Sequence, residues 1–255
     1  MPISQTAQEL IAVPGDAAVV AADSAPSPKS EIPSLVVGVI AFGLVLTTWL
    51  MAFFYAPVDA NQGQVYRIIF LHVPSAMTAF SSAAVLLVLS LVGLKTRSES
   101  SLLWARATAE TGLMYTGLTL ATGSIWGRPT WGVWWTWDAR LTTTLLLAIL
   151  YAGYLLLYAT MAPGPARVRS CAVLGILISI DVPIIYQSVS WWRTLHQPPS
   201  MFRGGGSTMS PEILTTLMTA MVSMIFMGGW LLWQRGRNLK LAEELERASF
   251  DQLKA

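Results

Sequence analysis

Charged residues are scarce in this sequence. Of its 255 residues only 12% are Asp, Glu, Lys or Arg, while 54% are apolar. A soluble domain usually has about 25% charged residues, so the composition argues against an ordinary cytosolic enzyme. The formal net charge is +2 and no basic tract occurs, which makes nucleic acid an unnatural partner.

Cysteine and phosphate-binding loops are also lacking. The single cysteine, Cys171, cannot build an intramolecular disulfide framework or a multi-thiolate metal site, and we interpret it as a small apolar residue. No Walker-type loop occurs, so energy from ATP would have to come from a partner. Residues 1–34 contain no basic start and no long apolar stretch. They do not resemble a signal peptide, and we expect a disordered cytoplasmic tail.

Long apolar runs, by contrast, are abundant. A helix needs about 20 apolar residues to cross a bilayer core, and six runs of that length occur between connections rich in charge and turn-forming residues. The sequence therefore predicts an all-α integral membrane protein: a six-helix membrane domain over residues 35–234, followed by a short charged cytoplasmic tail over 235–255. The expected spans are Leu35–Tyr55, Val73–Leu94, Leu102–Trp126, Leu141–Met161, Val168–Val189 and Ile213–Trp233.

The distribution of Lys and Arg predicts which way the spans face. Of the 16 basic residues, eleven fall in the termini and in alternate connections, and five fall in the opposite connections. Basic residues are enriched on the cytoplasmic side. Both termini are therefore expected in the cytoplasm, with the connection around residues 126–140 on the periplasmic face.

This connection, which we call the Trp-rich segment (residues 126–140), has an unusual composition. Five of the eleven Trp of the chain lie in it. An interfacial aromatic belt is the alternative explanation, but a belt spreads its Trp over many helix ends, as the scattered Trp elsewhere do. Clustered indoles offer a flat apolar surface with N–H edges, suited to a sugar ring or a porphyrin. The clustered residues are Trp126, Trp131, Trp134, Trp135 and Trp137.

The two histidines favour a porphyrin. His72 precedes Pro74 at the outward end of the second span, and His196 lies just beyond the outward end of the fifth. Both histidines of the chain are thus expected at the same membrane surface. A single histidine is more often structural, but two on one face beside an aromatic surface suggest a pair of axial haem ligands, which leave no open iron position for oxygen chemistry.

Other charged residues near this face are candidates for supporting roles. Haem propionates call for guanidinium groups, and each candidate could equally be an ordinary helix-end charge: Arg67, Arg128, Arg140 and Arg193. Asp138 could accept a hydrogen bond from a Trp N–H or pair with Arg140. Asp181 lies inside the fifth span, roughly 15 Å inward of Trp191, and is a functional candidate or a structural acid beside Pro183. Glu110 is expected to be a packing or partner contact.

The motifs together resemble a known family. Trp131–Thr142, WGVWWTWDARLT, resembles the tryptophan-rich "WWD" signature (about residues 126–142) of haem-handling proteins in cytochrome c maturation. The segments FLHVP (70–74), WGRP (126–129) and WWRTLHQP (191–198) narrow the resemblance to the CcmC family, the haem exporter protein C of the bacterial system I pathway. The resemblance covers roughly residues 60–235.

The resemblance implies a function and partners. It implies that His72 and His196 are the periplasmic axial ligands of haem b, and that Trp131, Trp135, Trp137 and Asp138 hold the porphyrin. It further implies a bacterial inner-membrane location and four partners: the ABC subunits CcmA and CcmB, the small membrane protein CcmD and the haem chaperone CcmE. The expected function is delivery of haem to that chaperone, not catalysis.

Two other functions are kept open. A b-type cytochrome subunit would hold haem permanently for electron transfer, usually between helices within the membrane. A permease or glycolipid-handling protein would use the Trp residues to stack on sugar rings, would make Asp181 central, and would leave both histidines replaceable.

Overall fold

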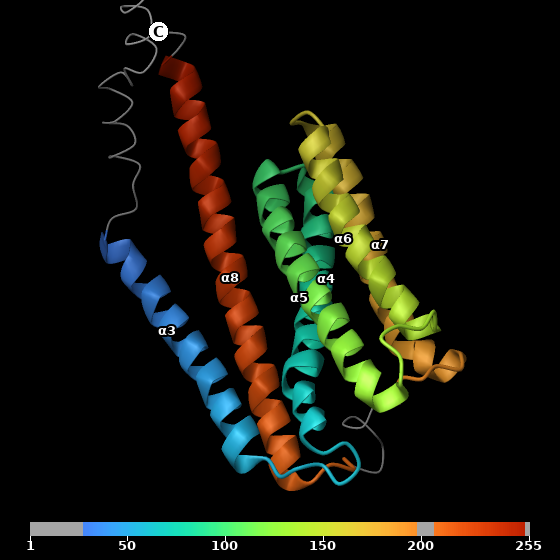
Figure 1. The fold of residues 1–255 in the computed structure, drawn as a ribbon. Coiled ribbons are helices and arrows are strands. Elements are labelled where there is room, and N and C mark those ends of the chain that lie inside the picture. The colour runs from blue at the N-terminus through green and yellow to red at the C-terminus, as the bar shows by residue number, and fades with distance from the viewer. Residues whose placement is uncertain (1–27, 198–206, 253–255) are drawn as a thin grey trace, which may run out of the picture.

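Six α-helices account for most of the residues that the computed structural model describes, which are 28–197 and 207–252 (Figure 1). They are α3 (Pro28–Leu50), α4 (Ile69–Thr96), α5 (Glu99–Trp131), α6 (Ala139–Thr160), α7 (Pro165–Trp191) and α8 (Pro211–Gln252). A π-helical turn, η1 (Met51–Tyr55), extends α3, and a 3-10 turn, η2 (Gln64–Ile68), leads into α4. The expected all-α fold is confirmed over these ranges.

The expected N-terminal tail, residues 1–34, falls largely outside the described residues. Its last part does not: residues 28–34 form the first turns of α3. Pro33 is the sixth residue of α3, so the helix lacks one backbone hydrogen bond, the one that residue 33 would otherwise donate to the carbonyl of residue 29.

The helices form two groups, α5–α7 and α3 with α8, and α4 packs against both groups. In Figure 1, α6 and α7 lie side by side on one edge of the bundle, α4 and α5 occupy the middle, and α8 and α3 form the opposite edge. α4 packs against α5, α7 and α8, whereas α3 packs chiefly on α8. The central apolar core lies between α4, α5, α6 and α7, around Leu86, Leu147, Tyr151 and Ile178.

Five of the helical segments are long and apolar enough to cross a membrane: Ile32–Tyr55, Gln64–Thr96, Ala139–Thr160, Pro165–Trp191 and Pro211–Asp251. The expected third span is the exception within the described residues. It forms α5, a helix of 33 residues, but its sequence is more polar than that of the other five.

The polarity of α5 comes largely from threonines that face its neighbours. Five of them are buried: Thr108, Thr111, Thr116, Thr119 and Thr122. Each hydroxyl donates to the carbonyl oxygen four residues earlier, at 2.7–2.9 Å. Bonding of this kind satisfies a hydroxyl inside a helix. α5 can therefore lie in the middle of the bundle without exposing these groups to lipid.

α8 is the longest helix. The sequence predicted a span ending at Trp233 and a separate short charged tail over 235–255, but the structure joins the span and most of this tail in one helix of 42 residues. At 1.5 Å per residue this is about 63 Å long, roughly twice the thickness of a bilayer core. The C-terminal part of α8 therefore extends past the ends of α5 and α6, as Figure 1 shows.

Candidate functional site

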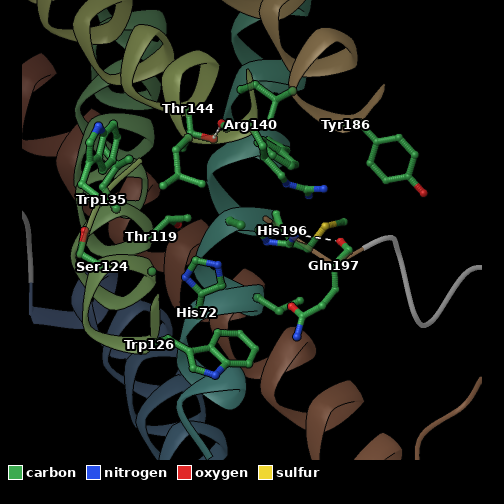
Figure 2. A pocket seen from close by; sticks show the side chains of 18 of the residues that line it. His72, Thr119, Ser124, Trp126, Trp135, Arg140, Thr144, Tyr186, His196 and Gln197 are labelled. Atoms are coloured by element: carbon green, nitrogen blue, oxygen red, sulfur yellow. Dashed lines mark hydrogen bonds between the residues drawn. The ribbon is translucent and has the colours of Figure 1, made fainter. Parts of the chain in front are cut away.

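Both histidines line one cavity, which marks what we call the histidine end of the bundle. The cavity has about 920 Å³ of empty space, part of it open to the exterior. Four other residues expected at the site also line it: Trp126, Trp131, Trp135 and Arg140. Figure 2 shows His72 and His196 in the middle of this group, with Trp126 below His72.

His72 is held in the first turns of α4 by two residues of α5. Its ring meets Trp126 edge to face, with centroids 5.7 Å apart. On another side it faces Gly123, where an added Cβ atom would lie 3.0 Å from the Cε1 atom of His72. A glycine at this position lets the imidazole approach the α5 backbone closely.

A contact with Thr122 favours one tautomer of His72. Nδ1 lies 3.1 Å from the Thr122 hydroxyl oxygen, and that hydroxyl is also 2.7 Å from Leu118 O, to which it can donate its proton. A hydroxyl that donates to Leu118 O can accept only from a protonated Nδ1. In that tautomer the Nε2 atom of His72 keeps an unprotonated lone pair, which is the form that ligates a metal.

His196 reaches the same state through a backbone carbonyl. It lies in the connection after α7, with its Nδ1 atom 2.8 Å from Gln197 O and its ring 6.1 Å from that of Trp131. A carbonyl only accepts, so Nδ1 carries the proton and Nε2 is free. Burial, with a smaller contribution from the Arg140 charge, lowers the pKa of His196 to about 4, so the imidazole is neutral at pH 7.

Of the four candidate arginines, the cavity includes Arg140. Its guanidinium group has no protein hydrogen-bond partner within the described ranges, so its donors remain available. The other three lie outside the lining. Arg67 donates to Phe53 O at 3.0 Å and Ala56 O at 3.4 Å, Arg128 donates to Gly132 O, and Arg193 is exposed.

The Trp-rich segment divides into a buried part and an exposed part. Trp126 and Trp131 belong to α5, which ends at Gly132 with a φ of +80°. Trp135 lines the cavity, and its buried Nε1 atom has no hydrogen-bond partner among the residues described. Trp134 and Trp137 lie outside the lining and are 59% and 76% exposed. Trp137 meets Trp135 edge to face at 5.6 Å.

Asp138 makes neither of the direct hydrogen bonds expected of it. Among the described residues neither a Trp N–H nor Arg140 donates to it, although its charge acts on that of Arg140. One carboxylate oxygen caps α6 by accepting from Leu141 N at 2.9 Å, and the other accepts from Leu195 N at 3.2 Å. Asp138 lies outside the cavity lining, but it ties the Trp-rich segment to the connection that carries His196.

The two acids of the expected spans lie away from this cavity. Asp181 of α7 is buried at 4% exposure, and its Oδ2 atom has no hydrogen-bond partner in the part of the chain that the structure describes. Glu110 of α5 pairs with Arg106 at 3.0 Å and with Arg235 of α8. Its role as a packing contact between helices agrees with expectation.

Several residues that build the site were not found from the sequence. Thr122 and Gly123 gave no signal because their partner, His72, lies about 50 residues earlier. Gln62, whose side-chain oxygen accepts from Trp126 Nε1 at 2.6 Å, lies in a connection without distinctive composition. Gln197 adjoins His196 in the WWRTLHQP segment. This adjacency was the only sequence signal for the contact between its carbonyl oxygen and His196 Nδ1.

Comparison with known proteins supports the resemblance over most of the chain. Residues 26–251 match the family described as CcmC, Heme exporter protein C. The chain is 36% identical to Heme exporter protein C of Escherichia coli K12 over 209 residues, 82% of this chain and 84% of the relative. It is 40% identical to Heme exporter protein C of Bradyrhizobium diazoefficiens over 168 residues, 66% and 64% of the two chains.

A mitochondrial relative belongs to the same group. The "putative cytochrome c biosynthesis ccmC-like mitochondrial protein" of Marchantia polymorpha is 34% identical over 209 residues, 82% of this chain and 86% of the relative. With the five apolar helices, these matches support a multi-pass membrane protein with a role in haem handling for cytochrome c maturation. The chain belongs to the CcmC family, described as Heme exporter protein C.

Proposed function

We propose that this chain captures haem b at the histidine end and delivers it to a periplasmic haem chaperone. The observation that carries this proposal is the pair of histidines lining one cavity, each with Nδ1 within hydrogen-bond distance of an oxygen atom. Two imidazoles can fill both axial positions of haem iron. Iron bound in this way is held for transfer, because no position is open to oxygen.

The rest of the cavity supplies what a porphyrin needs. Trp126, Trp131 and Trp135 present apolar surface for the ring, and the unpartnered Trp135 N–H is available to a polar group of the ligand. Arg140 is the residue proposed for a propionate. In this proposal Trp134, Trp137 and the other three arginines surround the site without lining it, so the exposed indoles can contact the incoming chaperone.

The topology belongs to the same proposal. All six long helices cross the bacterial inner membrane, including α5, whose polar groups face other helices. Both termini lie in the cytoplasm and the histidine end faces the periplasm, as the excess of basic residues in the alternate connections indicates. The membrane domain would span residues 35–234, between the tails 1–34 and 235–255.

Delivery requires other subunits. The proposed partners are the ABC subunits CcmA and CcmB, the small membrane protein CcmD and the chaperone CcmE. ATP hydrolysis is assigned to the ABC subunits, since this sequence has no phosphate-binding loop of the Walker type. The free Nε2 atoms of His72 and His196 provide exchangeable iron ligands, which is what a delivery protein needs.

The test is the visible spectrum and haem content of the protein purified after coexpression with the chaperone. We expect a bis-histidine spectrum for the wild type and its loss in His72→Ala and in His196→Ala, with failed chaperone loading. Leu195→Ala is the matched control, because its side chain is exposed and only its backbone N–H is used. Histidine variants that keep the wild-type spectrum would refute the ligand assignment. Haem that never leaves for the chaperone would favour an electron-transfer subunit.

A further inference from the structure

A second cavity lies at the other end of the bundle, between the C-terminal part of α8 and the ends of α5, α6 and α7. It has about 1,160 Å³ of empty space, including open solvent. We call it the α8 groove. The lining residues used here are Leu103, Arg106, Tyr158, Leu239, Glu243 and Glu246.

The α8 groove lies at the depth of a membrane surface. Its α8 residues begin at Leu239, about 42 Å along the helix from Pro211, while a bilayer core is about 30 Å thick and its headgroups extend further. Aromatic residues mark the same depth. Trp104 of α5 lies directly against Gly236 of α8, and Arg237 stacks on Trp233 at 5.7 Å. Trp is enriched at this boundary.

One guanidinium group on the α5 side of the groove, that of Arg106, is incompletely neutralised, whereas Glu99 and Arg167, which also line the groove, pair with each other at 2.9 Å. Glu110 is the shared partner of both Arg106 and Arg235, so one carboxylate faces two guanidinium groups. Arg106 is fixed over the ring of Tyr158, 4.8 Å from its centroid. Its Nε atom binds Glu110, and its Nη atoms have no protein hydrogen-bond partner within the described ranges.

The α8 side of the groove carries an excess of negative charge. Glu243 pairs with Arg247 one turn further along α8, which balances those two charges. Glu246 is exposed, and its carboxylate has no ion-pair partner among the described residues. The groove thus presents an incompletely neutralised guanidinium on one wall and a carboxylate on the other, and these two groups are not paired with each other.

We propose that the α8 groove binds the headgroup of a zwitterionic phospholipid of the phosphoethanolamine type. The phosphate binds Arg106, whose planar donors suit phosphate oxygens, and the ammonium group binds Glu246. Leu103 and Leu239 form a small, largely buried apolar cluster in the groove lining, against which we place the glycerol region of the lipid. Basic pockets between helices at a membrane surface are common headgroup sites, and the acid on the facing wall is what selects an ammonium-bearing lipid over an anionic one.

Native mass spectrometry of the full chain tests this proposal. The protein is released from nanodiscs that contain equal amounts of phosphatidylethanolamine and phosphatidylglycerol. We expect one phosphatidylethanolamine to be retained preferentially by the wild type. Arg106→Gln should reduce retention of both lipids about tenfold, as expected for loss of a charge-assisted hydrogen bond. Glu246→Gln should abolish the preference and leave phosphatidylglycerol retention unchanged.

Glu244→Gln is the matched control. It lies on the same part of α8 but not in the groove lining, and it pairs with Lys240 at 3.8 Å. We expect it to behave as the wild type. Equal retention of the two lipids by the wild type would overturn the proposal, as would a preference that survives Glu246→Gln. Because Glu246 is exposed, its variant keeps the fold and the test remains decisive even if Arg106→Gln destabilises α5.

Discussion

Thr122 should control haem affinity without touching haem. Its hydroxyl oxygen accepts from His72 Nδ1–H at 3.1 Å while donating to Leu118 O. Thr122→Val keeps the shape of the side chain and removes the acceptor. The imidazole then loses its side-chain partner, at a cost of up to about 1–3 kcal/mol, and can adopt the tautomer whose Nε2 atom is protonated.

The expected result is a loss of about 10- to 100-fold in haem affinity, which is typical when a second hydrogen bond to a metal-ligating histidine is removed. The assay is a haem titration of the protein in nanodiscs, followed by the Soret absorbance. Thr122→Ser is the matched control, because it retains the hydroxyl and should bind nearly as the wild type. If the Val variant bound haem with unchanged affinity and spectrum, or if Ser failed as badly as Val, Thr122 would not orient His72.

Three further predictions concern the same cavity. Gly123→Ala places a Cβ atom 3.0 Å from the imidazole that it faces and should weaken haem binding several-fold, whereas Gly117→Ala, where nothing lies within 4 Å, should not; equal effects in haem titrations would contradict this. Trp135→Ala should reduce haem retention more than Trp137→Ala, since only the former lines the cavity, and a reversed order of haem stoichiometries would count against the arrangement. Because the pKa of His196 is about 4, below its usual value of 6.5, the neutral ligand persists on acidification, and coordination to iron stabilises that neutral form further. The bis-histidine spectrum should therefore be constant down to about pH 5 and be lost only below about 4, and a midpoint near 6.5 would refute this.

The sequence was sufficient to predict the helices because membrane-spanning helices are defined by a local property. The lengths of the apolar runs located both ends of α4, α6 and α7 to within four residues. The exception is α3, which begins seven residues before the expected start of its span. α5 was expected from an apolar run, yet its threonines lower its hydropathy below that of the other five. The continuity of α8 through the charged residues after Trp233 was missed, because a change from apolar to charged composition marks a change of surroundings and not a helix end.

The site was predictable to the level of residue types but not of partners. His72, His196 and three of the clustered Trp line one cavity as expected, since helix ends on one face of a membrane are necessarily near one another. The choice of Arg140 from four arginines was not predictable, because the other three differ from it only in which backbone carbonyls or solvent they reach. The same holds for Thr122, whose contact with His72 depends on how α4 and α5 are rotated against each other.

Asp138 has a consequence for how the cavity can open. One of its oxygens holds the start of α6 and the other holds the backbone just before His196. The start of α6 and the connection that carries His196 are therefore linked through one carboxylate. Moving the second histidine away from the first requires either breaking the Leu195 contact or carrying the beginning of α6 along with it. While the Leu195 hydrogen bond is intact, opening of the cavity at this end displaces both segments together.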